Sequence, residues 1–424
     1  AYDIGDKISK LIPLGKQGFP MTIDIALDVE PELKKMYETD KVVKEIIDMA
    51  KKIEGCARHI SVHAAGVVIS PTEVSDYAPV QLDPKGGKII TQYDMHAVED
   101  AGLIKFDFLG IRNLAILADS IKLVEKIEGI KIDIDAIPID DPKTFKMLAE
   151  GKTMGVFQLS SSGMTRYLKE LIPSQIDDIN AMVALYRPGP MEMIPEYIKR
   201  KHNPILIRFL DPRMKDILDL SYGVITYQDD VMMIAIKLAG YSWLEADKLR
   251  KAMGKKIPEV MMAEKGKLME GLLKNGMTQK KADELWALIE PFAAYGFNKA
   301  HAASYGNLAY KTAYMKANFP VPYMSAILTA ESGDVERVSE IILECKKMDI
   351  EVLSPHINEC FGGFTVIKNE EEGKLDKIRF GFYTIKNLGG DISDAIIEER
   401  KKGGNFTSME NFLERVQHKN LTKK

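Results

Sequence analysis

Apolar residues recur at helical spacing along most of this chain. The pattern predicts two short helices between residues 26 and 52, and mostly helical structure from residue 116 to about residue 345. Gly and Pro interrupt the second region at RPGP, residues 187–190, and at FPVP, residues 319–322. One apolar stripe in this region, typical of core packing, comprises Ala282, Leu285, Ile289 and Phe292.

A strand period appears only in short, β-branched stretches. SVHAAGVVIS, KIITQYDM and LIKFDFLG lie between residues 60 and 110 and predict three strands of one small sheet. Near the C-terminus, FTVIKNEEEGKLDKIRFGF predicts a hairpin around a charged loop, followed by two short helices. These patterns predict an α+β fold that is predominantly helical, with a small β-sheet early in the chain.

One carboxylate is unusual in the third of these stretches. Asp107 lies between Phe106 and Phe108 in an apolar run that otherwise reads as a buried strand. Alternation places Lys105 and Asp107 on one face and the aromatic residues on the other. Because an ionised carboxylate buried without a partner is costly, Asp107 must be exposed, paired with Lys105, or bound to a cation. The residues alone leave the ion pair and the metal ligand open as alternatives.

Composition narrows the function classes only slightly. The 424 residues are enough for two to four domains, and with a net charge of -4 and a pI near 6.1 the overall charge does not indicate nucleic-acid binding. The three cysteines, Cys56, Cys345 and Cys360, form no zinc-type pattern and favour a reducing compartment. There is no long apolar run, no signal peptide and no starting Met, so we expect a soluble segment of a longer protein.

Eight ordered motifs together resemble the alpha subunit of bacterial DNA polymerase III, the C-family of replicative polymerases. They are RHISVHAAGVVIS, TQYDM, GLIKFDFLG, GVFQL, ALYRPGPM, YQDDVM, ADKLRKAMGKK and YGFNKAHAASY. Their order and spacing also fit, and the resemblance extends from near residue 10 to the end. It implies four domains, namely a thumb-like helical segment (1–57), the second part of the palm (58–115), the fingers (116–330), and a hairpin with a truncated helix-hairpin-helix region (331–424).

The resemblance implies that Asp107, in KFDFLG, is the third of three catalytic aspartates and a ligand in a two-Mg²⁺ site. In this family the first two aspartates belong to an earlier Asp-x-Asp motif, and no such motif precedes residue 58 here. We therefore expect residues outside this chain to complete the metal site, and the chain alone to be inactive. Lys105, on the same face as Asp107, is expected to balance phosphate charge, and the apolar strand to give a rigid, dry support.

The fingers motifs imply that basic and aromatic side chains grip the triphosphate of an incoming nucleotide. The expected nucleotide-binding residues are Arg250, Lys255, Lys256, Tyr295, Asn298, Lys299 and His301. The expected DNA contacts are Arg58, His63, Arg187, Lys386 and Gly389. The last two belong to a helix-hairpin-helix at residues 378–400, where Asn387 replaces the usual Gly and tolerates the left-handed conformation.

Three other polar sites are expected to be structural or altered. Asp133 and Asp135 have Asp-x-Asp spacing but lie in a segment that reads as a turn and helix start. Asp229 and Asp230 fit acids in the first turn of a helix better than a metal pair. Ser160 stands where the family usually carries Glu, so no carboxylate role is expected there.

The resemblance thus predicts the central part of a template-dependent DNA polymerase in the bacterial cytoplasm. Its expected partners are primer-template DNA, deoxynucleoside triphosphates and, through the parent chain, a sliding clamp and other replisome subunits. The alternative is a non-catalytic DNA-binding or replisome assembly module, since two of three carboxylates are missing. A metal-dependent phosphohydrolase fits Asp107 alone but leaves the fingers motifs unexplained.

Overall fold

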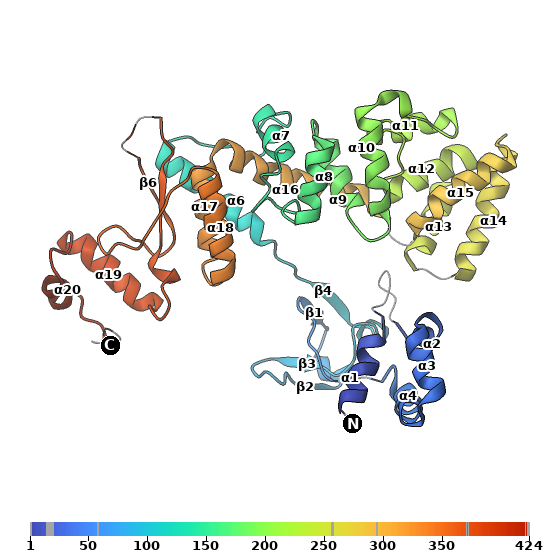
Figure 1. The fold of residues 1–424 in the computed structure, drawn as a ribbon, viewed down its shortest axis with the longest axis horizontal. Helices are drawn as coiled ribbons and strands as arrows, with labels where there is room; N and C mark the ends of the chain where they lie inside the picture. The colour runs from blue at the N-terminus through green and yellow to red at the C-terminus, as the bar shows by residue number, and fades with distance from the viewer. Residues whose placement is uncertain are drawn as a thin grey trace. The chain divides into compact units, whose positions relative to one another are not determined.

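The computed structural model describes residues 2–13, 21–56, 59–255, 258–293, 296–369, 371, 373–419 and 421. The chain forms two compact units, Ala1–Ile111 and Arg112–Lys424, which are called unit 1 and unit 2 below. Figure 1 traces both units, from blue at the N-terminus to red at the C-terminus. Within the described ranges, no helix is long and apolar enough to cross a membrane.

Unit 1 begins with four helices packed around a small core. They are α1 (Tyr2–Leu11), α2 (Ile23–Val29), α3 (Pro31–Thr39) and α4 (Lys41–Ile53). The buried side chains between them are Ile8, Ala26, Leu27, Leu33, Val43 and Ile47. Residues 26–52 thus contribute to three helices where the apolar pattern predicts two, because Glu30 and Asp40 are extended and cap the helices that follow.

The strands of unit 1 pair as two separate sheets. They are β1 (Gly66–Ile69) antiparallel to β4 (Ile104–Asp107), and β2 (Val80–Leu82) antiparallel to β3 (Ile89–Thr91). The expectation of three strands in one sheet is therefore wrong. The stretch KIITQYDM pairs with β2, which the pattern did not indicate, because the N–H of Asp83 donates to the carbonyl of Lys88 and closes a tight turn. Gly86 and Gly87 take positive φ values of 84° and 80° in that turn.

The β1–β4 sheet is more exposed than its apolar sequence suggests. A small core beside it includes Val98 of the short helix α5 (Ala97–Asp100). The alternation expected in β4 is present, but Phe106 is 46% exposed and Phe108 is 67% exposed. The expectation of a buried, dry strand around Asp107 is therefore wrong for unit 1 taken by itself.

Unit 2 is built around the long helix α16. The helices of this part are α6 (Arg112–Glu128), α7 (Pro142–Ala149), α8 (Ser162–Leu171), α9 (Ile176–Leu185), α16 (Lys299–Asn318) and α17 (Pro320–Ala330). Helix α16 packs against α9 and α7, and α17 packs against α6. Helix α16 therefore brings the segments around residues 140, 180 and 300 together.

A second group of helices in unit 2 follows α9 along the chain. They are α10 (Ile194–His202), α11 (Lys215–Leu218), α12 (Gln228–Ala239), α13 (Trp243–Lys255), α14 (Pro258–Lys274) and α15 (Gln279–Ala293). Helices α12 to α15 pack on one another and form one bundle in Figure 1. The stripe expected on α15 is confirmed at Ala282, Leu285 and Ile289, which are fully buried, while the side chain of Phe292 lies outside the described residues.

The C-terminal part of unit 2 combines a small sheet with helices. The elements are α18 (Val335–Lys347), β5 (Val352–Leu353), β6 (Thr365–Ile367), β7 (Lys377–Arg379), α19 (Gly390–Gly403) and α20 (Met409–Arg415). The expected hairpin is confirmed as the antiparallel pair β6–β7, and β5 adds a parallel strand to β7 that the pattern did not indicate. The predominantly helical α+β fold is thus confirmed.

Candidate functional site

The carboxylate of Asp107 ends β4 and lies between two basic side chains. Its Oδ1 is 3.6 Å from Nε2 of His63, and its Oδ2 is 3.6 Å from Nζ of Lys105. Lys105 is placed there by the alternation of β4, whereas His63 arrives through the ladder, in which Gly66 of β1 is opposite Asp107. The side chain of Asp107 is 42% exposed, so its carboxylate remains accessible to a ligand.

No described contact joins Arg58, Asp133 or Asp135 to the Asp107 carboxylate. Arg58 lies outside the described residues. Within the part of the chain that the structure describes, no group of three or more His, Cys, Asp or Glu side chains could hold a metal ion. Asp133 and Asp135 lie in a turn of unit 2, where Asp133 accepts the N–H of Asp135 and Lys311 pairs with Asp135. These contacts agree with the structural role expected for both aspartates.

In unit 2 the starts of α12 and α16 are joined by polar contacts. Asn298 caps α16, and its Oδ1 accepts the N–H of His301 at 2.9 Å. Oδ2 of Asp229 accepts the N–H of Lys299 at 2.8 Å and so ties α12 to α16. Nζ of Lys299 lies 5.5 Å from the ring centroid of Tyr227. The side chain of Lys299 is therefore exposed beside an aromatic ring, while its backbone is fixed.

Asp230, next in the chain to Asp229, is buried at the start of α12. Its Oδ2 accepts the N–H groups of Thr226 and Tyr227, both at 2.9 Å. Burial raises the pKa of this carboxyl to about 6, against the lowering effect of those two hydrogen bonds. The expectation that Asp229 and Asp230 belong to the first turn of a helix agrees with this geometry.

A row of aromatic rings follows the start of α16. The ring of His301 is 5.1 Å from that of Phe297 and 4.1 Å from that of Tyr305, and Tyr305 is 5.1 Å from Phe157. The guanidinium of Arg187 lies 3.7 Å from the ring centroid of Phe297, and burial lowers the pKa of Arg187. The motifs ALYRPGPM, GVFQL and YGFNKAH therefore meet in one place.

The structure describes the side chains of only part of the basic motif LRKAMGKK. Arg250 in α13 pairs with Asp247 at 2.8 Å, and Lys251 pairs with the same carboxylate at 2.8 Å. Three predicted nucleotide-binding residues have side chains outside the described residues, namely Lys255, Lys256 and Tyr295. Arg250 is thus held in an ion pair of its own helix and is not joined to the aromatic row by a described contact.

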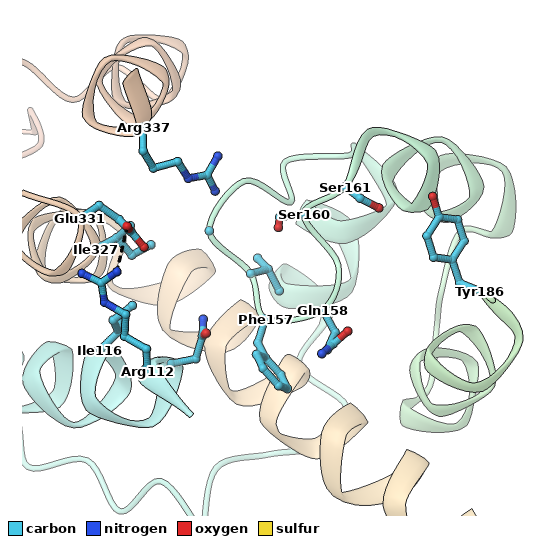
Figure 2. Close-up of a pocket in the computed structure, with 13 residues that line it drawn as sticks. Arg112, Ile116, Phe157, Gln158, Ser160, Ser161, Tyr186, Ile327, Glu331 and Arg337 are labelled. Carbon is cyan, nitrogen blue, oxygen red and sulfur yellow. Dashed lines mark hydrogen bonds and ion pairs between the residues drawn. The ribbon is translucent and has the colours of Figure 1, made fainter. Parts of the chain in front are cut away.

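A pocket of 520 Å³ lies next to the GVFQL loop (Figure 2). Figure 2 shows Arg112 paired with Glu331 on one side, at 3.0 Å, and Ser160, Ser161 and Tyr186 on the other. Apolar and polar side chains both line it, and they come from α6, α17, α18, the loop before α8 and the end of α9. The sequence did not predict this pocket, although the motif GVFQL and the change to Ser160 pointed to its loop.

The predicted hairpin near residue 387 takes a compact form. The helix expected before it is only a 3₁₀ turn, Phe382–Thr384, and Asn387 has a φ of 68°, so the left-handed conformation expected for this residue is confirmed. Gly389 is the N-terminal capping residue of α19. Lys386 and Gly389 are both exposed at this end of α19.

Comparisons with known proteins relate these features to one family. Residues 1–110 match the model of the bacterial DNA polymerase III alpha NTPase domain. Residues 113–276 match the bacterial DNA polymerase III alpha subunit finger domain, and residues 349–424 match the helix-hairpin-helix motif. The first two matches meet at the boundary between unit 1 and unit 2.

Curated relatives are similar along the whole chain. The DNA polymerase III subunit alpha of Thermus aquaticus is 42% identical over 424 residues, which are 99% of this chain and 34% of that protein. The subunit of Escherichia coli K12 is 41% identical over 434 residues, covering 100% of this chain and 37% of that protein. For Chlamydia trachomatis the identity is 43% over 403 residues, with 95% and 32% covered. The chain spans about a third of the length of these relatives, and it belongs to the family of bacterial DNA polymerase III alpha subunits.

Proposed function

We propose that this chain is the central part of a DNA-directed DNA polymerase that adds deoxynucleotides to a primer 3'-hydroxyl in bacterial chromosome replication. The observation that carries the proposal is the accessible carboxylate of Asp107, held between His63 and Lys105. Its position in KFDFLG is that of the third catalytic aspartate in the family that the chain resembles. Membership of the polymerase III alpha family supports a role in replication.

Asp107 fits one ligand position of a two-Mg²⁺ site. Mg²⁺ prefers hard carboxylate oxygens, and Asp107 offers two that solvent can reach. Because one carboxylate cannot hold two ions, residues outside this chain would supply the remaining ligands. Bound Mg²⁺ would stabilise the negative charge of the triphosphate during phosphoryl transfer. Lys105 would add a positive charge on the same face of β4.

The start of α16 is the proposed site for the incoming nucleotide. Lys299 places a cationic group beside the ring of Tyr227, and the N-terminus of α16 also favours a nearby anion. The partly exposed rings of His301 and Tyr305 suit stacking with a base. Further proposed members of this site are Arg250, Lys255, Lys256, Tyr295 and Asn298.

The proposed contacts to DNA involve both units. In unit 2, the hairpin at Asn387 and the exposed Gly389 present backbone N–H groups that suit phosphate oxygens, and Lys386 adds a positive charge. Arg187, which lies over Phe297, is a second proposed contact, and Arg58 of unit 1 is a third. Such contacts would hold the duplex without reading its sequence.

The proposed partners are primer-template DNA, deoxynucleoside triphosphates and, through the parent protein, a sliding clamp and other replisome subunits in the bacterial cytoplasm. A second candidate function is a non-catalytic DNA-binding or replisome assembly module. The observation that favours it is that the described residues contain no cluster of metal-ligating side chains. The two functions differ in the consequence of removing the charge of Asp107.

The test compares Asp107→Asn with Asp28→Asn, which changes an exposed carboxylate on α2, in the full-length alpha subunit that contains this chain. If Asp107 is a metal ligand, its loss affects mainly the transition state. We expect Asp107→Asn to lower kcat by several orders of magnitude and to leave primer-template affinity nearly unchanged. Asp28→Asn should retain both. The 424-residue chain alone should give no primer extension above background.

Two outcomes would contradict the proposal. A lower melting temperature with near-normal turnover for Asp107→Asn would show that the carboxylate serves only as the partner of Lys105. Template-dependent synthesis by the 424-residue chain alone would show that no ligands from elsewhere are needed.

A further inference from the structure

We propose that His63 is a positioning residue for the carboxylate of Asp107 and not a contact to DNA. This inference rests on the proposed function, in which Asp107 binds a metal ion. The hydrogen bonds of the imidazole ring decide between the two roles of His63, because they determine which nitrogen carries the proton.

The backbone of the next residues fixes the ring of His63. Nδ1 accepts the N–H of Gly66 at 2.7 Å and the N–H of Ala65 at 3.2 Å. A nitrogen that accepts hydrogen bonds carries no proton, so the ring proton lies on Nε2. Nε2 is the atom that faces Oδ1 of Asp107, at 3.6 Å. The tautomer set by the backbone therefore directs an N–H donor at the carboxylate.

Gly66 is the residue that permits this arrangement. A Cβ atom at this position would lie 2.9 Å from Nδ1 of His63, closer than such atoms approach in proteins, and 3.0 Å from Cγ. The ring thus occupies the space that any other side chain at position 66 would fill. His63 and Gly66 act together, and the spacing His-x-x-Gly in SVHAAGVVIS is the sequence pattern that encodes the contact.

The strand register brings the ring to Asp107. Gly66 is opposite Asp107 in the β1–β4 ladder, and the N–H of Phe108 donates to the carbonyl of Ala65 at 2.9 Å. The turn that holds His63 is therefore hydrogen-bonded to the strand end that carries Asp107. Any shift of β4 against β1 would separate the two side chains.

The two donors restrain the orientation of the carboxylate. His63 faces Oδ1 and Lys105 faces Oδ2, each at 3.6 Å, so electrostatic attraction on both sides favours this orientation of the carboxylate. Both contacts are longer than a hydrogen bond, so the acceptor positions of both oxygens remain for a cation. Groups that orient a metal ligand in this way commonly change metal affinity or activity by about 10–100-fold when removed.

A DNA contact is a weaker account of His63. Nδ1 is used by two backbone N–H groups and Nε2 is directed at Asp107, so a phosphate would have to compete with the carboxylate for Nε2.

The first experiment observes the tautomer in the 424-residue chain labelled with ¹⁵N-histidine, at mildly alkaline pH. Long-range ¹H–¹⁵N correlations should show His63 as the Nε2–H tautomer, identified by its loss in His63→Gln. Asp107→Asn should change the chemical shifts of His63. It should leave unchanged those of His96, which is exposed elsewhere in unit 1. A proton on Nδ1, or no response to Asp107→Asn, would overturn the proposal.

The second experiment compares His63→Gln with His63→Asn in the full-length alpha subunit. The amide of Gln reaches the position of Nε2 and can still donate to Asp107, whereas the amide of Asn ends near Nδ1. We expect His63→Asn to lower kcat by about 10–100-fold and to weaken Mn²⁺ binding measured without turnover, and His63→Gln to retain more of both. The KM for deoxynucleotide and the Kd for primer-template should stay unchanged in both variants.

The opposite pattern of effects would show that His63 contacts DNA or the nucleotide. Weaker primer-template binding or a raised KM, with kcat and Mn²⁺ binding unchanged, would overturn the positioning role. Failure of the proposed function would give a different result. Near-normal turnover of Asp107→Asn would exclude a catalytic role for Asp107. The tautomer of His63 and its response to Asp107→Asn would still test the contact between these two side chains.

Discussion

The buried ammonium of Lys316 joins three parts of unit 2. The side chain is fully buried, and its Nζ donates to the carbonyls of Lys152 and Met154, at 2.9 and 2.8 Å, and to Oε1 of Glu344 at 2.8 Å. Burial lowers the pKa of Lys316, and the ion pair with Glu344 opposes that shift. Lys316 thus links α16 to α18 and to the segment that enters the GVFQL loop.

The change Lys316→Met removes the ammonium and keeps most of the aliphatic chain. It leaves the carboxylate of Glu344, which is 11% exposed, and two carbonyl groups without their donor. Breaking a buried ion pair by removing one partner costs about 3–5 kcal/mol of the free energy of unfolding. The matched control is Lys311→Met on the same helix, where the partner Asp135 is 82% exposed and the expected cost is about 0–1 kcal/mol.

A double variant separates the charge from the packing. Lys316→Met combined with Glu344→Met removes both charges, so that no lone carboxylate remains buried. We expect the double variant to be more stable than Lys316→Met alone, because only the two carbonyl groups then lack a partner.

Urea unfolding measures these differences. Both tryptophans lie in unit 2, where Trp286 is buried and Trp243 is exposed, so their fluorescence follows this unit, and circular dichroism follows the whole chain. A loss of stability for Lys316→Met no greater than for Lys311→Met would refute the reasoning. A double variant less stable than Lys316→Met would show that the lone carboxylate is not the cause of the loss.

Two further predictions concern the C-terminal hairpin and the start of α12. Lys386→Ala should make the log–log salt dependence of duplex affinity shallower by about one unit, because one phosphate contact is lost. The control Lys374→Ala, in the loop between β6 and β7, should leave the slope unchanged. Equal slopes for the two variants would exclude the contact. The pKa of Asp230 is raised from 3.8 to about 6, so the folded state binds its proton more tightly than the unfolded state and gains stability as pH falls below 6. Relative to Asp230→Asn, the wild-type chain should lose about 2 kcal/mol of its free energy of unfolding between pH 4 and pH 7. Melting curves with the same pH dependence in both proteins would contradict the raised pKa.

Local periodicity explains why the helices could be predicted and the strand pairing could not. The stripe on α15 repeats every three to four residues, so neighbouring positions alone indicate which face is buried. The pairing of β3 with β2 instead depends on a glycine turn that reverses the chain between them. Three short apolar stretches carry no information about which of them will be neighbours.

Some contacts of the candidate site could likewise be predicted from the sequence, and others required the structure. Alternation within one strand predicted that Lys105 and Asp107 share a face, and the structure places their charged groups 3.6 Å apart. The contact of His63 with Asp107 crosses the β1–β4 ladder and required the register. Phe297, just before α16, and His301 and Tyr305 on α16 are four residues apart. This spacing could have revealed the aromatic row before its neighbour Phe157 was known.

The start of α16 shows how the fold limits which polar groups remain for a ligand. Oδ1 of Asn298 accepts the N–H of His301, so one acceptor position of this oxygen and the amide nitrogen remain for a ligand. The carboxylate of Asp229 is likewise used by the N–H of Lys299, and this fixes the backbone of Lys299 while its ammonium stays exposed. The negative charge of Asp229 thus lies at a backbone N–H, and the positive charge of Lys299 remains exposed to solvent. The exposed ammonium of Lys299 is therefore available to an anion at this end of α16, and Asp229 holds the backbone of that lysine in place.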